Sequence, residues 1–154
     1  MKKIVVLTDT HNNLADLQKI QTILNEADLI IHCGDGYINV LQLNTNYKTK
    51  FVYVQGNCDG GSSERIIEVE GVKILIVHGH QYGVKQSLLP LTYKAKQEQV
   101  KLVLYGHTHI AQEEEIDGVI YFNAGTMQKY TTQKSYGYVV IHDHKIITKI
   151  VKVN

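Results

Sequence analysis

The sequence predicts a mixed α/β domain made of two packed β-sheets with helices outside them. Two observations support this prediction. In the first half of the chain, short β-branched and aliphatic runs alternate with segments whose apolar residues have helical spacing. In the second half, short strand-like runs follow one another in pairs separated by turn residues. The first pattern is typical of alternating strands and helices, and the second is typical of hairpins.

In the first half, apolar runs that end at polar residues are predicted to be strands. These strands are residues 2–7, 28–32 and 50–54. A helix is predicted after the first strand, where Asn12 or Asn13 can cap it. Its apolar positions are Leu14, Leu17, Ile20, Ile23 and Leu24. A weaker helix is predicted over residues 38–43.

In the second half, three hairpins are predicted about Glu70-Gly71, Asp117-Gly118 and His142-Asp143-His144. The predicted strands are residues 65–69, 72–77, 102–105, 111–116, 119–122, 136–141 and 145–151. Residues 84–99 carry a helical stretch that Pro90 starts or interrupts. The chain shows no internal repeat, linker or low-complexity tract.

Length and composition indicate one globular domain. A chain of 154 residues is large enough to bury its own core, so we expect a single domain over residues 1–154 without a cap domain. Apolar residues make up 44% and charged residues 20%, an ordinary globular balance. The formal net charge of +1 argues against an extended nucleic-acid groove.

The sequence also lacks the signals of membrane insertion and secretion. No apolar run approaches the roughly 18 to 20 residues needed to cross a bilayer. The apolar run 4–7 that follows Met1-Lys2-Lys3 is too short for a signal peptide. Cys33 and Cys58 lie apart without a C-x-x-C pattern, which does not suggest a disulfide scaffold. We therefore expect a cytoplasmic protein with no membrane partner.

Five of the predicted strands end in small groups of polar residues beside a glycine or a turn. The groups are Asp9 and His11, Gly34-Asp35, Gly56-Asn57, His78-Gly79-His80 and Gly106-His107-Thr108-His109. Ligands of α/β sheets gather at the carboxyl ends of strands, so we expect these groups to meet at one edge. Carboxylate, imidazole and amide donors suit divalent transition metals better than calcium. Seven such donors are too many for one tetrahedral site and fit two metals about 3.5 to 4 Å apart.

The last of these groups is the most informative one. If the extended conformation persists past the strand, His107 and His109 point to the same face and address one point. Gly106 would then let the backbone come close to that point. The alternative is a pair of surface histidines in a turn.

The motifs D-x-H, G-D, G-N-x-D, H-G-H and G-H-x-H, in this order, resemble those of the calcineurin-like metallophosphoesterases. The Gly-Asn-Cys-Asp and His-Gly-His segments are most similar to the small YfcE-type phosphodiesterases of bacteria and archaea. The resemblance spans residues 4 to about 126. It implies a four-layer αββα sandwich. It also implies hydrolysis of a small or accessible phosphodiester by in-line attack of a metal-bridging hydroxide.

The resemblance assigns a role to each motif residue. It implies that Asp9, His11 and His109 hold one metal, that Asn57, His78 and His107 hold a second, and that Asp35 bridges them. Mn is the expected metal, with Ni, Co, Fe and Zn as alternatives. His80 would lie one shell out, orienting a neighbour or contacting substrate. The amide of Asn57 would help to carry the charge that develops on the phosphate.

Of the departures from the family pattern, the one at position 58 bears on the chemistry. Cys58 stands where many relatives have a histidine that protonates the leaving group, and a thiol is a weaker acid for this role. Asp59 or His80 are the alternative acids, and the sequence does not choose between them. Asn123-Ala124-Gly125-Thr126 replaces Asn-Pro-Gly-Ser and is interpreted as a turn packing beside the site.

Other functions remain open at this stage. A phosphomonoesterase, a nucleotide pyrophosphohydrolase and a metal-binding scaffold protein without turnover are the alternatives to a phosphodiesterase. The expected partner is a small phosphodiester, and assembly into a homo-oligomer stays undecided. His32 is interpreted as a packed core histidine, and His142 and His144 as surface residues.

Overall fold

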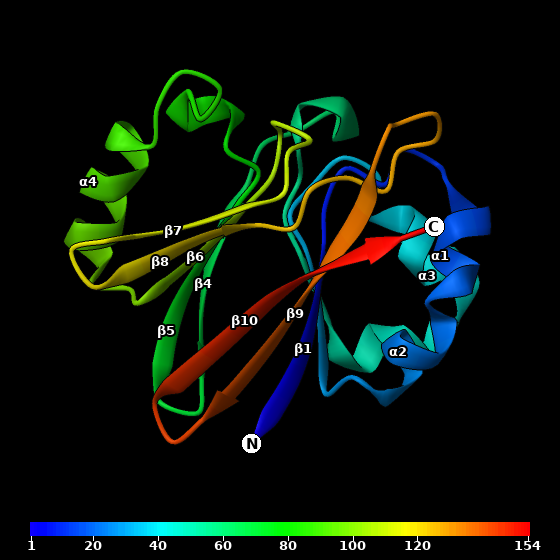
Figure 1. Cartoon of the computed structure of the whole chain (residues 1–154), viewed down its shortest axis with the longest axis horizontal. Coiled ribbons are helices and arrows are strands. Elements are labelled where there is room, and N and C mark those ends of the chain that lie inside the picture. The colour runs from blue at the N-terminus through cyan, green and yellow to red at the C-terminus, as the bar shows by residue number, and fades with distance from the viewer.

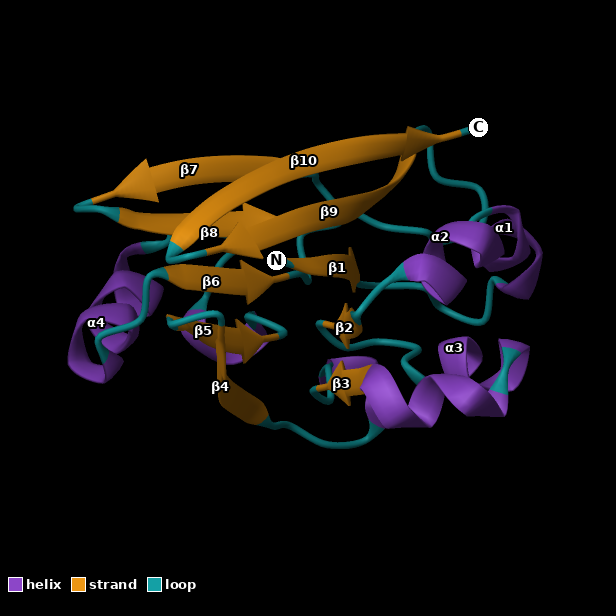
Figure 2. Cartoon of the chain, turned by 90° about the horizontal axis from the view of Figure 1, so that it is seen from below, coloured by secondary structure: helices purple, strands orange, loops and turns teal.

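The computed structural model describes residues 1–154 and contains two five-stranded sheets packed face to face. Helices α1, α2 and α3 cover the outer side of one sheet, and α4 covers the outer side of the other (Figures 1 and 2). This arrangement confirms the predicted mixed α/β fold with helices outside two sheets.

The first sheet has the strand order β10-β9-β1-β2-β3. Its strands are β1 (Lys2–Leu7), β2 (Leu29–His32), β3 (Phe51–Tyr53), β9 (Lys134–His142) and β10 (Lys145–Val153). The second sheet has the order β4-β5-β6-β8-β7. Its strands are β4 (Glu64–Val69), β5 (Val72–Val77), β6 (Leu102–Tyr105), β7 (Gln112–Ile116) and β8 (Val119–Asn123).

Each sheet combines parallel strands with antiparallel hairpins. Strands β1, β2 and β3 are parallel, as are β5, β6 and β8. The parallel strands β1, β2, β5 and β6 all lead into the loops that carry the predicted ligands. Hairpins β4–β5, β7–β8 and β9–β10 complete the sheets, each with a two-residue turn. The turn after β9 is Asp143-His144, because His142 still belongs to the strand.

The apolar runs of the central strands are explained by burial on both faces. Alternate residues such as Ile4, Val6 and Ile31 face the layer between the sheets. The residues between them, such as Val5 and Leu7, pack in a second cluster with the core residues of α1 and α2. In the second sheet the outer-facing residues pack in the same way against α4. A strand with two buried faces has no polar positions, so the sequence shows a continuous run.

The helix predicted over residues 38–43 is confirmed, whereas the other two predicted helical stretches differ from the observed helices. The observed helices are α1 (Leu14–Lys19), α2 (Gln21–Glu26), α3 (Ile38–Leu43) and α4 (Leu89–Glu98), with 3₁₀ segments η1 (Thr45–Lys50), η2 (Asn57–Asp59) and η3 (His80–Tyr82). The expected helix over residues 14–24 is divided at Ile20, whose N–H binds the carbonyls of Leu17 and Gln18. Helix α4 begins at Leu89 with Pro90 in its first turn, where a missing N–H is tolerated. No helix is long and apolar enough to cross a membrane.

Candidate metal centre

The loops after β1, β2, β5 and β6 meet at one end of the two sheets. Backbone hydrogen bonds join them in pairs: Asp9 N–H donates to Gly34 O (3.0 Å), and Gly106 N–H donates to His78 O (2.9 Å). The first bond links two loops of one sheet, and the second links two loops of the other. The predicted gathering of polar groups at the carboxyl ends of strands is therefore confirmed for these four loops.

Asp9 joins the two sheets through its fully buried carboxylate. Its Oδ2 atom accepts hydrogen bonds from Thr8 Oγ1 (2.6 Å) and from the backbone N–H of His107 (3.1 Å). Its Oδ1 atom has no hydrogen-bond partner. That atom faces His109 Nε2 at 3.1 Å and His11 Nε2 at 3.6 Å. One oxygen thus fixes the loops, and the other is free for a ligand.

Asp35 lies opposite Asp9 and divides its two oxygens in the same way. Oδ1 accepts the backbone N–H of Cys58 (2.8 Å). Oδ2 lies 3.1 Å from His78 Nε2 and 3.9 Å from His11 Nε2. The free oxygen therefore stands between histidines of both sheets.

His78 has one ring nitrogen committed to the backbone. Nδ1 lies 2.8 Å from the carbonyl oxygen of Cys33, which can only accept, so Nδ1 carries a proton and donates it. In the neutral ring Nε2 is then a lone pair that points at carboxylate oxygens of Asp35 and, at 3.8 Å, of Asp9. Burial is the largest single influence and opposes a charged ring, but the carboxylates of Asp35 and Asp9 and the carbonyl of Cys33 together outweigh it and raise the pKa of His78. This position calls for a cation, either a proton or a metal ion.

His11 supports the same conclusion. Its Nε2 atom is buried without a hydrogen-bond partner. The neighbouring Asp9 carboxylate raises the pKa of His11 despite partial burial. Three sets of possible donor atoms lie within 4.8 Å of one another, and two of them hold only carboxylates and imidazoles: Asp9 with His11 and His109, and Asp9 with Asp35 and His78. Carboxylate and imidazole donors in such groups fit divalent transition metals.

The expectation that His107 and His109 continue an extended strand is wrong. Both have left-handed backbone, with φ of 72° and 63°. Their imidazoles consequently have different neighbours. His107 Nδ1 lies 3.3 Å from His78 Nε2, whereas His109 Nε2 lies 3.1 Å from Asp9 Oδ1.

Gly106 is required at its position by the close approach of the loops. A Cβ atom there would lie 2.7 Å from Asp9 Oδ2 and would also collide with Thr8 Oγ1. The expectation that this glycine lets the backbone come close to the site is confirmed.

Asn57 and Cys58 lie at the exposed start of η2. The Asn57 side chain donates to Cys58 Sγ (3.7 Å). Cys58 Sγ lies within 4.8 Å of donor atoms of His11 and Asp35, so this thiol lines the site as expected. The assignment of Asn57 as a metal ligand stays a prediction.

Asp59 holds the loop backbone rather than facing the cluster. Its carboxylate accepts N–H groups from Asp35 (2.7 Å), Gly36 (2.9 Å) and Gly56 (2.9 Å). Both oxygens are therefore occupied by the backbone of the two loops that carry Asp35 and Asn57. These contacts favour a role of Asp59 in positioning the two loops, and its assignment as the acid that protonates the leaving group stays a prediction.

His80 lies beside the cluster, as expected for a residue one shell out. Its ring centroid is 5.4 Å from that of His78 and 5.9 Å from that of His107. Nε2 lies 3.3 Å from Ser62 Oγ, and Nδ1 is buried without a partner. Burial and then the charge of His78 lower the pKa of His80. Its part in proton transfer stays a prediction.

The turn over residues 123–126 packs beside the site, as interpreted from the sequence. Asn123 Nδ2 donates to Gly106 O (3.2 Å) and to Thr108 Oγ1 (2.9 Å). Thr126 Oγ1 donates to the carbonyl of Asp9 (2.8 Å). Both side chains hold loops that carry candidate ligands, and neither is among those ligands.

Sequence reasoning missed the buried polar residues that fix these loops. Thr8 donates to the Asp9 carboxylate, and Asn39 Oδ1 accepts the N–H of Asn12 (2.9 Å). Thr10 and His32 hydrogen-bond each other, although His32 was expected only to fill the core. Its full burial agrees with that interpretation. The only signal for Thr8 and Thr10 is that they flank Asp9 in the sequence, which does not distinguish them from other loop threonines.

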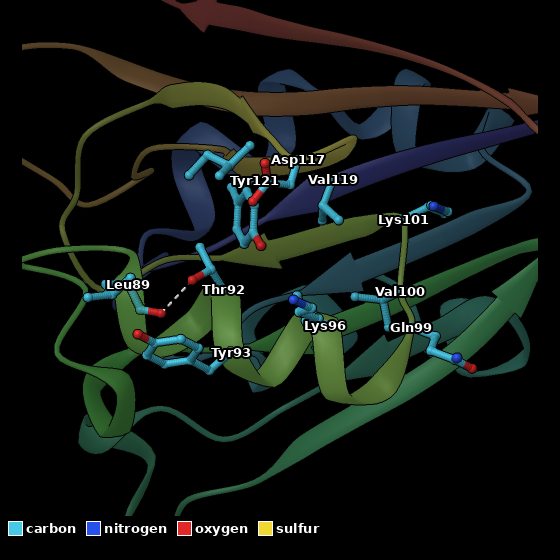
Figure 3. A pocket seen from close by; sticks show the side chains of 12 residues that line it. Leu89, Thr92, Tyr93, Lys96, Gln99, Val100, Lys101, Asp117, Val119 and Tyr121 are labelled. Atoms are coloured by element: carbon cyan, nitrogen blue, oxygen red, sulfur yellow. Dashed lines mark hydrogen bonds between the residues drawn. The ribbon is translucent and has the colours of Figure 1, made fainter.

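A separate hollow of about 550 Å³ lies between α4 and the β7–β8 hairpin (Figure 3). Tyr93, Lys96, Val119 and Tyr121 are among its lining residues. None of the candidate ligands lines it. The candidate metal centre is therefore distinct from this hollow.

Comparison with known proteins agrees with the motifs. Residues 1–145 match the model of the calcineurin-like phosphoesterase superfamily domain. The probable metallophosphoesterase YsnB of Bacillus subtilis is 31% identical over 144 residues, covering 90% of this chain and 82% of that protein. Phosphodiesterase MJ0936 of Methanocaldococcus jannaschii is 32% identical over 150 residues, covering 84% and 87%. Phosphodiesterase YfcE of Escherichia coli is 22% identical, covering 97% and 98%.

Solved structures share the fold. A predicted phosphoesterase from Streptococcus pneumoniae superposes with a TM-score of 0.80 at 22% identity, covering 98% of this chain and 89% of that one. A mutant of Vps29 from Entamoeba histolytica superposes with a TM-score of 0.77 at 20% identity, covering 99% of both chains. From the family match and the relatives above 30% identity, this chain belongs to the calcineurin-like phosphoesterase superfamily.

Proposed function

We propose that this chain is a metal-dependent phosphodiesterase whose substrate is a small or accessible phosphodiester. Membership of the phosphoesterase superfamily makes hydrolysis of a phosphate ester the reaction class. Relatives named phosphodiesterase support the diester as substrate. We further propose that residues 1–154 act as one domain without a cap, which suits an accessible substrate.

The proposed ligands of two divalent ions are Asp9, His11, Asp35, Asn57, His78, His107 and His109. The observation that carries this proposal is the pair of buried, unpartnered atoms Asp9 Oδ1 and His11 Nε2, 3.6 Å apart. Leaving polar atoms unpaired and buried costs about 1 to 3 kcal/mol each unless a ligand satisfies them. Asp35 Oδ2, between histidines of both sheets, supports its role as the bridge.

Mn is the proposed metal, with Ni, Co, Fe and Zn as alternatives, because the donors are nitrogen and oxygen. Two bound ions would neutralise the phosphate and supply the nucleophile at neutral pH. The protein's own residues fix the donors: Cys33 O orients His78, and the backbone N–H of Cys58 orients Asp35. Orientation of ligands by such contacts affects both metal affinity and activity.

His80 is the better supported of the two proposed acids. Its ring lies beside His78 and His107 and contacts Ser62, whereas Asp59 uses both oxygens on backbone N–H groups. Burial, then the Asp35 carboxylate, raises the pKa of the Cys58 thiol, so the thiol keeps its proton at neutral pH. Cys58 can therefore face the leaving group as a neutral donor only.

The test combines a metal screen with Asp35→Asn. Metal-free protein is loaded with Mn²⁺, Ni²⁺, Co²⁺, Zn²⁺ or Mg²⁺ and assayed with bis-p-nitrophenyl phosphate and with p-nitrophenyl phosphate. We expect the diester to be cleaved faster, and Asp35→Asn to lower Mn²⁺-dependent hydrolysis by at least about 100-fold, because it removes the charge that bridges the ions. Asp117→Asn, in a distant hairpin turn, is the matched control and should keep wild-type activity.

Other results would decide between the alternatives. Faster cleavage of the mono-ester would replace the diesterase with a phosphomonoesterase. Mn²⁺ binding without turnover of any ester would favour a scaffold protein of this fold, which would act by binding partner proteins. Full activity of Asp35→Asn would refute the proposed ligand set.

A further inference from the structure

A buried chain of hydrogen bonds joins the loop after β1 to the loop after β2. His32 Nδ1 lies 3.0 Å from the backbone nitrogen of Gly34, and His32 Nε2 lies 3.0 Å from Thr10 Oγ1. Thr10 Oγ1 in turn lies 2.8 Å from the carbonyl oxygen of Gly36. His32 is fully buried and Thr10 is 1% exposed, so water does not compete for these bonds.

The direction of each bond follows from the groups at the two ends. The Gly34 N–H can only donate, so His32 Nδ1 is a lone pair. The Gly36 carbonyl can only accept, so the Thr10 hydroxyl gives its single proton to it. A second neighbour of this hydroxyl, Asn39 Oδ1 at 3.5 Å, is also an acceptor. Thr10 must therefore accept from His32, and Nε2 carries the proton of a neutral ring.

Three residues of this hydrogen-bond network are sequence neighbours of candidate ligands. Thr10 stands between Asp9 and His11, while Gly34 and Gly36 stand on either side of Asp35. Backbone bonds run alongside, from Thr10 N–H to Asp35 O (3.0 Å) and from His11 N–H to Asp35 O (3.3 Å). The hydrogen bonds of Thr10 and His32 thus connect the loop after β1 with the loop after β2, both of which carry candidate ligands.

The backbone there needs such support. Asp9, His11 and Asp35 have φ of 53°, 42° and 64°, a left-handed conformation. Residues other than glycine pay about 1 to 2 kcal/mol for it and keep it only when their surroundings fix it. An apolar side chain of similar size at position 32 would fill the core but would leave the Gly34 N–H and the Thr10 hydroxyl without this partner.

We propose that His32 and Thr10 form one positioning unit that sets the distance between Asp9 and His11 on one side of the metal centre and Asp35 on the other. The inference rests on the proposed metal centre. His32 and Thr10 act through the loops and touch no metal, so their effect belongs in metal affinity rather than in folding alone.

The test uses Thr10→Val, which keeps the shape of the side chain and removes its hydroxyl. Thr10→Ser keeps the hydroxyl, and Thr92→Val makes the same chemical change in α4, at the hollow that lies apart from the metal centre. Mn²⁺ binding to metal-free protein is measured by titration calorimetry, together with the unfolding midpoint of the metal-free protein. We expect Thr10→Val to raise the Kd for Mn²⁺ at least about 10-fold, and both controls to stay within about 3-fold.

His32→Asn provides a second, independent variant, because its amide oxygen can keep the Gly34 bond while the bond to Thr10 is lost. It should weaken Mn²⁺ binding to a similar degree, and adding Thr10→Val should weaken it little further, because both changes break one unit. If Thr10→Val does not fold, the result for His32→Asn decides.

Unchanged Kd values in variants with lowered unfolding midpoints would overturn the inference and make His32 a structural residue only. Wild-type protein that binds no Mn²⁺ would overturn the proposed function as well. Wild-type binding with full binding by both variants would overturn the positioning unit alone.

Discussion

The two ends of the sheets both contain residues with left-handed backbone, but for different reasons. At the hairpin end these are Glu70-Gly71, Asp117-Gly118 and Asp143-His144, with φ between 48° and 79°. At the metal-centre end they are Asp9, His11, Asp35, His107 and His109, with φ between 42° and 72°. The same region of backbone conformation is thus used in two-residue turns and in ligand-bearing loops.

At the hairpin end the conformation has a local cause. A two-residue turn of type I′ needs positive φ at both residues, because its twist matches that of the strands. Asp-Gly is a typical sequence for this turn, and glycine adopts the conformation without steric cost. The turn sequence and the two strands on either side are sufficient to explain it.

At the metal-centre end the cause is tertiary. Thr126 Oγ1 holds the Asp9 carbonyl, Asp59 holds the Asp35 N–H, and Asp9 Oδ2 holds the His107 N–H. Each of these partners is distant in sequence. The loops therefore keep an unfavourable backbone, which costs of order 1 to 3 kcal/mol at each residue, because other elements fix it in the geometry of the site.

The largest effect that would test this comparison is expected for Gly106→Ala. The added methyl group would collide with Thr8 and lie 2.7 Å from Asp9 Oδ2, displacing the carboxylate that joins the two sheets. We expect Mn²⁺-dependent hydrolysis to fall at least about 100-fold and the free energy of unfolding to fall by roughly 1 to 3 kcal/mol. Activity assays and urea unfolding measure the two. Wild-type activity in this variant would show that the loops adjust freely, and the difference between the fixed loops and the local hairpin turns would then not hold.

A second effect concerns pH, because the metal-centre end holds a buried neutral histidine. Burial lowers the pKa of His32 from its usual 6.5 to about 4. Between these values the unfolded chain binds the proton and the folded chain does not. The contribution of His32 is therefore fully present above about pH 6.5 and is lost as the pH falls toward 4, by up to about 1.4 kcal/mol per pH unit.

His32→Asn isolates this contribution, because other histidines also titrate in this range and the pKa values of two of them, His80 and His107, are lowered as well. The pKa values of His11 and His78 are raised, so their contribution grows as the pH falls. The relevant quantity is the difference between wild type and variant in the free energy of unfolding, measured in urea at pH 4.5, 5.5 and 7 on metal-free protein. We expect the wild type to lose more stability than the variant toward low pH. Equal losses would mean that His32 is protonated in the fold.

The smallest effects are expected at the hairpin end. Gly118 has φ of 79° and no atom within 4 Å of an added Cβ, so Gly118→Ala should cost only about 1 kcal/mol of backbone strain. Gly71 has the same φ, but an added Cβ would collide with the His144 ring, and the backbone N–H of His144 donates to Glu70 O (3.3 Å). We expect Gly71→Ala to cost roughly 2 to 3 kcal/mol in urea unfolding, with hydrolysis unchanged in both variants. Loss of hydrolysis in either variant would show that the hairpin end and the metal-centre end depend on each other.

Most of the secondary structure and the family could be predicted from the sequence alone. Continuous apolar runs marked the doubly buried strands, and turn residues marked the hairpins, because both signals are local. The division of residues 14–24 at Ile20 was not predictable, since apolar spacing is the same in one helix and in two short ones. The candidate ligands were found because each stands directly after a strand in a motif of fixed order.

The backbone conformation and the hydrogen bonds that bring those residues together could not be predicted from the sequence. His107 lies beside His78 and His109 lies beside Asp9, the grouping that the family resemblance implies, but left-handed loops bring them there instead of the extended strand expected from the apolar run. Asp59 binds the loop backbone, and His32 takes part in a hydrogen-bond network in addition to filling the core. The physical reason is that side-chain direction at a strand end depends on left-handed backbone angles, which contacts with distant loops impose. Strand and turn patterns in the sequence are local and do not predict contacts between distant loops.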